Sequence, residues 1–168
     1  MGGVMPMSRK AVLPDDVRKM CIQIVRGYDR RVRNYNNRRQ EIINGTPCHH
    51  EIIKDPNDPD DLEKTSWVYQ PVSHNASRTT EGIASRILGL EEQPETKRMR
   101  AVERAKLQIG IDLPEELRKK LTEAVILNCK SGRRYPYTCF YLPGIEKTNF
   151  YDRRSDFLYS IAEYLEMV

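Results

Sequence analysis

The sequence predicts an all-α protein: a long basic N-terminal helix, an irregular acidic arm and a C-terminal helical bundle. Apolar residues recur at spacings of three and four over most of the chain, as on one face of a helix. Prolines followed by acidic residues mark helix starts, and glycines mark stops. At 168 residues the chain has the length of about one domain. We expect three segments: the basic helix (1–43), the arm (44–77) and the helical domain (78–168).

The composition argues against several classes of protein. Hydrophobic residues make up 39% of the chain, and no apolar run approaches the ~20 residues of a membrane helix. The first ten residues show no signal-peptide pattern, so we expect a cytoplasmic protein. The four cysteines form no Cys-x-x-Cys pair and are expected to be free thiols. Without a phosphate-binding loop or a familiar catalytic motif, we expect no enzyme activity and no cofactor.

Charge is unevenly distributed along the chain, although the net value is only +4. Residues 1–43 contain ten Lys and Arg against four Asp and Glu, and residues 94–134 contain eleven against six. Residues 44–93, between them, contain four basic and nine acidic residues. Two basic blocks suit a polyanionic partner. Ordinary solvated faces explain the charge pattern equally well.

A single helix over roughly 15–43 is predicted at the N-terminus. It starts at Pro14-Asp15-Asp16 and stops at Asn44-Gly45 and Pro47. Its apolar stripe is Val17, Met20, Cys21, Ile24, Val25, Tyr28, Val32, Tyr35, Ile42 and Ile43. That stripe fits either the core of this chain or the seam of a homodimer.

The other face of this helix is strongly basic. It carries Arg18, Lys19, Arg26, Arg30, Arg31, Arg33, Arg38 and Arg39. So many cations on one helix repel one another unless solvent, acids or phosphates offset the repulsion. We therefore assign Arg26, Arg30, Arg31, Arg33 and Arg38 to contact with nucleic-acid phosphates. Packing of these arginines on the acidic arm is the structural alternative.

Residues 44–77 are predicted to be an irregular acidic arm. The run 55–61 holds two prolines and four aspartates without the spacing of a calcium loop. Trp67-Val68-Tyr69 is an apolar patch expected to dock on the body. Cys48, His49, His74 and Cys139 could in principle converge on zinc, but no spacing requires it, and we expect no metal site.

Three further helices are predicted between residues 79 and 134. Ile83, Ile87, Leu88 and Leu90 indicate a short one, and Pro94 opens the next. The second places Met99, Val102, Ala105, Lys106 and Ile109 on one face and Lys97, Arg98, Arg100 and Arg104 on another, which we assign to phosphates. Asp112, Pro114 and two glutamates start the third, with Asp112 as its capping residue. Its inner face is Leu117, Leu121, Ala124, Val125 and Asn128, and Gly132 ends it.

A final helix is predicted over roughly 147–166. Its core stripe is Phe150, Phe157, Leu158, Ile161 and Leu165. A glycine-containing turn followed by a helix with polar residues in its first turn fits a helix-turn-helix-like C-terminus. In that motif the first turn faces base edges, where Arg bonds guanine and Asn bonds adenine. The candidate reading residues are Lys147, Asn149, Arg153 and Asp152, and Arg154 is assigned to nucleic-acid binding.

The segment Ile145 to Tyr159 resembles the end of phage-encoded transcriptional activators of the RinA/ArpU type. Residues 100–105 and 113–118 are similar to the helices before that end, and residues 26–31 resemble the basic opening of related prophage proteins. The resemblance implies a helix-turn-helix similar to sigma-factor region 4 and a role in activating phage genes inside a bacterial host. The segment 135–143, which precedes the final helix, holds two prolines and four aromatic residues, leaving about one helical turn.

The function predicted from the sequence is a DNA-binding transcriptional regulator of phage or prophage origin. Its expected partners are double-stranded DNA and RNA polymerase, with homodimer formation open. The alternative is a phage-encoded inhibitor, similar to anti-CRISPR proteins, that binds a host protein or nucleoprotein effector. In that case either the acidic arm would imitate a phosphate backbone, or the basic face would bind the guide RNA of an effector.

Overall fold

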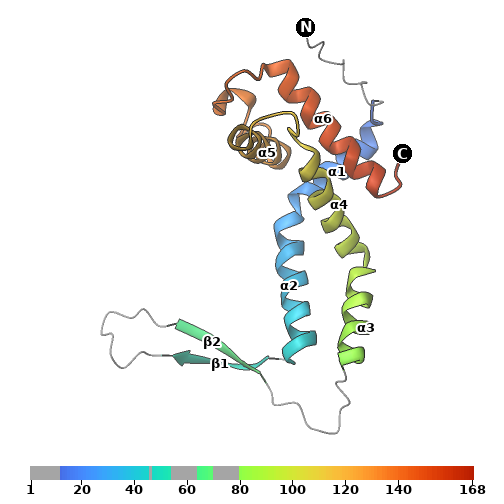
Figure 1. Ribbon diagram of the computed structural model, residues 1–168, viewed down its shortest axis with the longest axis vertical. Coiled ribbons are helices and arrows are strands. Elements are labelled where there is room, and N and C mark those ends of the chain that lie inside the picture. Colours follow the sequence, from blue (N-terminus) through green and yellow to red (C-terminus); the bar gives the residue numbers. More distant parts are fainter. Residues whose placement is uncertain (1–11, 46, 54–63, 70–79) are drawn as a thin grey trace. The chain divides into compact units, whose positions relative to one another are not determined.

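The computed structural model describes residues 12–45, 47–53, 64–69 and 80–168. In chain order the elements are α1 (Asp15–Arg26), α2 (Tyr28–Asn44), β1 (Pro47–Ile53), β2 (Lys64–Tyr69), α3 (Thr80–Glu91), α4 (Pro94–Gln108), α5 (Glu115–Lys130), a 3₁₀ turn (Tyr137–Cys139) and α6 (Lys147–Tyr164). Figure 1 colours them along the chain. Six α-helices build the described part of the fold, which confirms the predicted helical class.

The prediction of a wholly irregular arm is wrong. Residues 47–53 and 64–69 pair as an antiparallel two-stranded sheet, from Pro47 opposite Tyr69 to Ile53 opposite Lys64, with an irregularity between Pro47 and His49. Isoleucine, valine and aromatic residues favour extended backbone, and both strands contain them. The runs were too short to be identified against the surrounding acidic and proline-rich sequence. The aspartate- and proline-rich run 55–61 lies outside the described residues.

The described residues form two compact units. One contains residues 12–31 and 97–168, and the other lies within residues 32–96. Helices α2 and α4 each cross from one unit to the other along the chain. The first unit therefore joins the N-terminal helix α1 to the C-terminal helices.

The predicted N-terminal helix is interrupted at Gly27 and forms α1 and α2. The Gly27 amide still donates to the Gln23 carbonyl at 3.1 Å, and the Arg31 amide donates to the Gly27 carbonyl at 3.1 Å. The chain therefore continues in helical hydrogen bonding with a local irregularity. The two parts differ in burial: α1 buries Cys21, Ile24 and Val25, whereas no residue of α2 is buried. In α1 the apolar stripe is thus intramolecular core, although Met20, predicted on that stripe, is 52% exposed.

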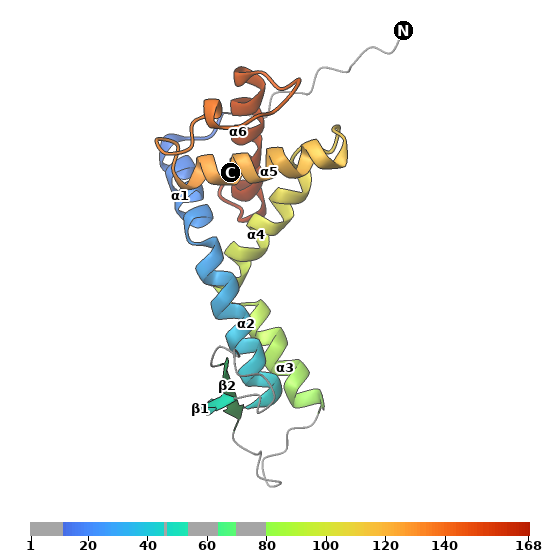
Figure 2. The same cartoon turned by 90° about the vertical axis from the view of Figure 1, so that its left-hand side faces the viewer.

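The core of the first unit is built by four helices and one loop. α1 contributes Cys21 and Val25; α4 contributes Val102, Ala105 and Ile109; α5 contributes Leu121, Ala124, Val125 and Cys129; α6 contributes Phe150, Phe157, Leu158, Ile161 and Ala162. Figure 2 shows the C-terminal end of α5 beside α1. These positions confirm the predicted inner faces of α4, α5 and α6. Burial of side chains of this kind contributes about 1.5–3 kcal/mol each.

The connection from α5 to α6 does not confirm the predicted helix-turn-helix-like end. Residues 131–146 contain a single 3₁₀ turn, Tyr137–Cys139, where that motif needs a full helix and a short turn. The physical reason lies in the sequence, since Pro136 and Pro143 restrict helical geometry on both sides. Core contacts fix the connection: Leu142 and Ile145 are buried, and the Tyr137 hydroxyl donates to the Ile145 carbonyl at 2.6 Å.

The second unit contains most of α2, the hairpin and α3. The Tyr35 hydroxyl of α2 donates to Glu91 Oε1 of α3 at 2.5 Å, and Arg38 Nη1 donates to Gln93 Oε1 at 3.1 Å. Leu90 is buried, whereas Leu88, predicted on the same apolar face, is 66% exposed. Among the described residues no helix has both the length and the apolar character needed to cross a membrane.

Candidate nucleic-acid interface

Arg153, in the second turn of α6, has its guanidinium group bound by Asp112 and Asn149. Arg153 Nη1 and Nη2 donate to the two carboxylate oxygens of Asp112 at 2.8 and 2.7 Å, and Nε donates to Asn149 Oδ1 at 2.7 Å. The hydrogen bond from Arg153 is the main reason that the pKa of Asp112 lies below its ordinary value. The same bond raises the pKa of Arg153. The predicted pair Asn149 and Arg153 is therefore brought together, but the guanidinium fork is already occupied.

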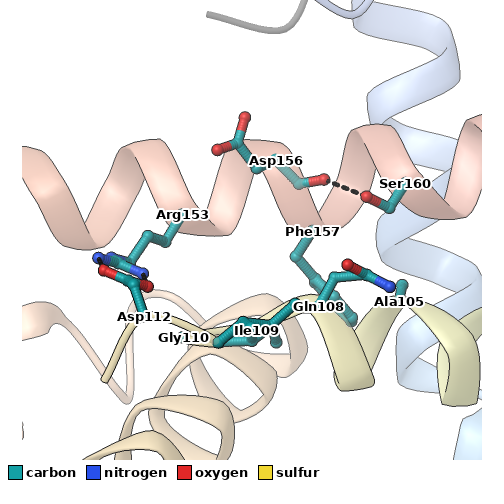
Figure 3. Close-up of a pocket in the computed structure, with 10 residues that line it drawn as sticks. Ala105, Gln108, Ile109, Gly110, Asp112, Arg153, Asp156, Phe157 and Ser160 are labelled. Atoms are coloured by element: carbon teal, nitrogen blue, oxygen red, sulfur yellow. Dashed lines mark hydrogen bonds and ion pairs between the residues drawn. The ribbon is translucent and has the colours of Figure 1, made fainter. Parts of the chain in front are cut away.

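Asp112 does not cap α5 as the sequence predicted. Helix α5 begins at Glu115 after Pro114, and no side chain caps its first turn. The Asp112 carboxylate points to α6, where it accepts two hydrogen bonds from the charged Arg153. These two bonds are stronger than the single bond that a backbone amide of α5 would provide. Figure 3 shows Asp112 and Arg153 facing one another between the two segments.

A cavity of about 410 Å³ lies beside this ion pair, between the end of α4, the following turn and α6. Phe157 points from α6 toward Ile109 and Ala105, so the inner wall is apolar, whereas Asp156 directs its carboxylate away from Phe157 (Figure 3). The volume lies in the range of small-ligand sites. Because the guanidinium lining this cavity is already paired with Asp112, the cavity presents mainly an apolar wall.

In the first unit, two arginines of the N-terminal segment, Arg26 and Arg31, donate to backbone carbonyls. Arg26 Nε donates to the Lys130 carbonyl at 3.0 Å, at the end of α5. Arg31 is half-buried, and its Nη1 donates to the Ile24 carbonyl at 2.8 Å. Arg30 is exposed. A carbonyl acceptor positions a guanidinium without neutralising its charge.

The other two predicted arginines of α2 belong to the second unit. Arg33 is exposed, and Arg38, also exposed, donates to the amide oxygen of Gln93. These two side chains are assigned to a different unit from Arg26, Arg30 and Arg31. We therefore describe them as a separate part of the candidate interface.

Helix α4 presents most of its predicted cations to solvent. Lys97, Arg98 and Arg104 are exposed, and the Arg104 guanidinium carbon lies 5.8 Å from the centre of the Tyr164 ring. Arg100 is half-buried and forms an ion pair with Glu103 at 2.8 Å. Glu103 also accepts a hydrogen bond from the Tyr28 hydroxyl at 3.4 Å, which helps to join α4 to the start of α2. Arg100 thus contributes at least partly to internal structure.

The last two predicted residues on α6 differ in exposure. Lys147 is exposed at the first position of the helix. Arg154 is half-buried, and its Nε is a buried nitrogen without a hydrogen-bond partner in the described structure. Burial raises the pKa of the nearby Cys129 thiol to about 11, and the charge of Arg154 counteracts part of that rise.

Three cations at the end of α5 were missed as site residues. Lys130 ends the helix, and the exposed Arg133 and Arg134 follow Gly132. The signal was present, because an adjacent Arg pair after a helix-ending glycine is visible in the sequence. The hydrogen bond from Arg26 to the Lys130 carbonyl was not visible in the sequence, because Arg26 comes from α1 and lies 104 residues earlier.

The four residues predicted as possible zinc ligands are not all among the described residues. His74 lies outside the described residues, and Cys139 is exposed at the end of the 3₁₀ turn. In the part of the chain that the structure describes, no three His, Cys, Asp or Glu side chains gather as a metal site would require.

Comparison with known proteins gives no assignment of family. The chain matches no protein-family model, no curated protein and no solved structure.

Proposed function

We propose that this protein binds double-stranded DNA and regulates transcription. The basic side chains of α1, α2 and α4 would contact phosphates, and the first turn of α6 would contact base edges. The support comes from charge and position: the net charge is +4, and Arg30, Arg33, Lys97, Arg98, Arg104 and Lys147 are all exposed.

One observation carries the proposal: several arginines are positioned by neutral groups. Arg26 bonds a backbone carbonyl, Arg38 bonds an amide oxygen and Arg104 faces an aromatic ring. Each side chain is oriented while its full positive charge is retained. An arginine that only stabilised the fold through charge would be expected to face a carboxylate, as Arg153 does. Oriented and uncompensated guanidinium groups suit the phosphates of a nucleic acid.

We propose that fewer residues of α6 contact bases than the sequence suggested. Lys147 and Asn149 are exposed on the first turn. The oxygen of the Asn149 amide accepts from Arg153, so its nitrogen remains the part able to donate to a base. Arg153 would reach a base only after leaving Asp112.

Titration of a fluorescent duplex with the full chain tests the proposal. At about 50 mM and about 200 mM salt, the logarithm of the association constant should fall linearly with the logarithm of salt concentration. An Arg30→Ala/Arg104→Ala double variant should lower that slope by about one unit for each phosphate that the protein no longer binds. The control, Lys119→Ala/Lys120→Ala, removes the same charge from exposed positions of α5 and should leave the slope unchanged. Absence of binding at the lower salt concentration would overturn the proposal.

Selection from a pool of random duplexes tests sequence reading. The wild-type chain should enrich a preferred sequence, and Lys147→Ala/Asn149→Ala should weaken that preference by about 1–3 kcal/mol for each good base contact. An unchanged preference would show that the first turn of α6 does not read bases. A chain that ignores DNA but forms a stable complex with a host protein would favour the inhibitor hypothesis instead.

A further inference from the structure

Three helices of the first unit bring cations together at the C-terminal end of α5. Arg26 comes from the end of α1, Lys130 from the end of α5, and Arg154 from α6, while Arg133 and Arg134 follow α5 directly. We call these five side chains the α5-end cluster. Only Arg26 and Arg154 were identified from the sequence.

Contacts connect Arg26 with Lys130, and Arg133 and Arg134 lie on the turn that directly follows Lys130 in the chain. Arg26 Nε donates to the Lys130 carbonyl at 3.0 Å. Lys130 Nζ forms an ion pair with Asp29 at 2.5 Å. The charges of both Arg26 and Arg154 act on the thiol of Cys129, the residue before Lys130. Cations from α1, α5 and α6 therefore surround the last turn of a single helix.

The cluster has a large excess of positive charge. Among the described residues, Asp29 is the carboxylate that forms an ion pair with a cluster member. The C-terminal end of a helix offers about half a negative charge, and it acts within the last turn. These two contributions compensate only part of five cations. The Nε of Arg154 is a buried nitrogen without a hydrogen-bond partner in the described structure, and the Arg154 side chain also interacts with the neutral thiol of Cys129.

The turn that carries Arg133 and Arg134 is fixed by the backbone around it. The Tyr135 amide donates to the Ser131 carbonyl at 2.9 Å. Asn128, which is 2% exposed, donates from Nδ2 to the Tyr135 carbonyl at 2.7 Å. The Arg134 guanidinium carbon lies 5.5 Å from the centre of the Tyr135 ring. Two exposed arginines are thus presented by a turn that a buried side chain anchors, which reduces the entropy lost on binding.

We propose that the α5-end cluster is a principal phosphate-binding site for duplex DNA. The inference rests on the proposed function and specifies where the DNA backbone is held. Arg133 and Arg134 make the direct phosphate contacts, while Arg26 and Lys130 orient the turn. Since phosphates are the same at every base pair, this site contributes affinity without sequence preference.

The test compares Arg133→Ala/Arg134→Ala with wild type in the full chain, on duplexes of selected and random sequence. The slope of log association constant against log salt should fall by about two units, and affinity should fall by the same factor on both duplexes. Both side chains are exposed, so the thermal midpoint should not change. Arg133→Lys/Arg134→Lys, which keeps the charge, should restore most of the slope. Lys119→Ala/Lys120→Ala is the control for general loss of charge on α5.

The outcomes separate the two proposals. If wild type binds DNA and the Arg133→Ala/Arg134→Ala variant keeps its slope, the cluster is not a phosphate site, although the DNA-binding function stands. If the variant loses affinity on the selected duplex alone, the pair reads sequence and the inference is also wrong. If wild type binds no DNA at low salt, both proposals are overturned.

Discussion

Asp112 and Arg153 hold one another by two parallel hydrogen bonds of 2.7 and 2.8 Å across 41 residues of sequence. The bond joins the turn between α4 and α5 to the second turn of α6. The Arg153 side chain is 14% exposed and that of Asp112 is 54% exposed, so solvent screens the pair only on one side. In this geometry Asp112 competes with any phosphate or base for the guanidinium of Arg153.

Replacing Asp112 by asparagine should lower the stability of the fold at neutral pH by about 1 kcal/mol, because a charged bidentate pair is lost. The folded-state pKa of Asp112 is below the ordinary 3.8, so its contribution is present above that value and disappears as the pH falls through the lower folded-state pKa. Urea unfolding of wild type and Asp112→Asn at about pH 7 and about pH 2 measures this. The difference should be larger at the first pH than at the second.

Glu115→Gln provides the control for that comparison. Glu115 pairs with Lys119 at 2.7 Å, but both side chains are more than 70% exposed. Its replacement should change stability by less than about 0.5 kcal/mol at neutral pH. An equal loss in both variants would mean that the Asp112–Arg153 pair has no special structural role.

Gly110 should tolerate no side chain without loss of stability. Its φ is +63°, and a Cβ there would lie 3.2 Å from Leu113 Cδ1 and 3.3 Å from Leu121 Cδ2. Gly110→Ala should therefore destabilise the fold by roughly 1–2 kcal/mol from the backbone conformation, with the close contacts adding to it. Gly89→Ala in α3 is the matched change, since an added Cβ there would meet no atom within 4 Å apart from its chain neighbours and the local backbone of its own helix. It should leave stability unchanged or raise it by up to about 1 kcal/mol. The midpoint of thermal unfolding is measured for both variants. Equal midpoints would show that glycine is not required at position 110.

Phe150 should be among the costliest side chains to remove. It is completely buried, and its ring centre lies 5.5 Å from that of Tyr137, 5.9 Å from Phe140 and 5.3 Å from Tyr151. Phe150→Ala should lower the free energy of unfolding by about 3–5 kcal/mol. Tyr141→Ala, at a position 83% exposed, should have an effect below about 0.5 kcal/mol. Denaturant titration monitored by circular dichroism measures the free energy of unfolding of both variants. If Phe150→Ala loses no more stability than Tyr141→Ala, Phe150 is not a central residue of the core.

The buried thiols should be inert in the folded protein. Burial raises the pKa of both Cys21 and Cys129 to about 11, whereas Cys139 is exposed. In a Cys48→Ser background, a disulfide reagent at about pH 8 should modify one thiol in the native chain and three after unfolding. The raised values also predict a loss of stability as the pH rises from the ordinary 9.0 through the folded-state pKa, because the unfolded chain releases these protons first. Rapid modification of a second thiol in the native chain would contradict this burial.

Local signals in the sequence were sufficient for most helices of the first unit. Prolines followed by acids placed the starts of α1 and α5, and three–four spacing gave the buried faces of α4, α5 and α6. Gly27 was not identified as an interruption because the apolar stripe continues on both sides of it. The hairpin was missed because its two strands are short and pair only through backbone atoms distant in sequence.

The candidate site was less accessible to sequence reasoning. Residue type and spacing identified which side chains carry positive charge, but the partner of each depends on tertiary contacts. The pairing of Arg153 with Asp112 spans 41 residues, and that of Arg26 with the Lys130 carbonyl spans 104. No periodic pattern encodes such contacts. The same limitation hid the α5-end cluster, whose members come from three helices.

The interruption at Gly27 has a consequence for how such a chain can diverge. On its N-terminal side, α1 carries three buried residues that must fit against other helices. On its C-terminal side, no residue of the seventeen in α2 is fully buried, although half-buried Tyr28 packs against the core. Steric fit therefore limits mutation more strongly before the glycine than after it. Descendants of one ancestor would be expected to share α1 long after their α2 segments have ceased to be alignable.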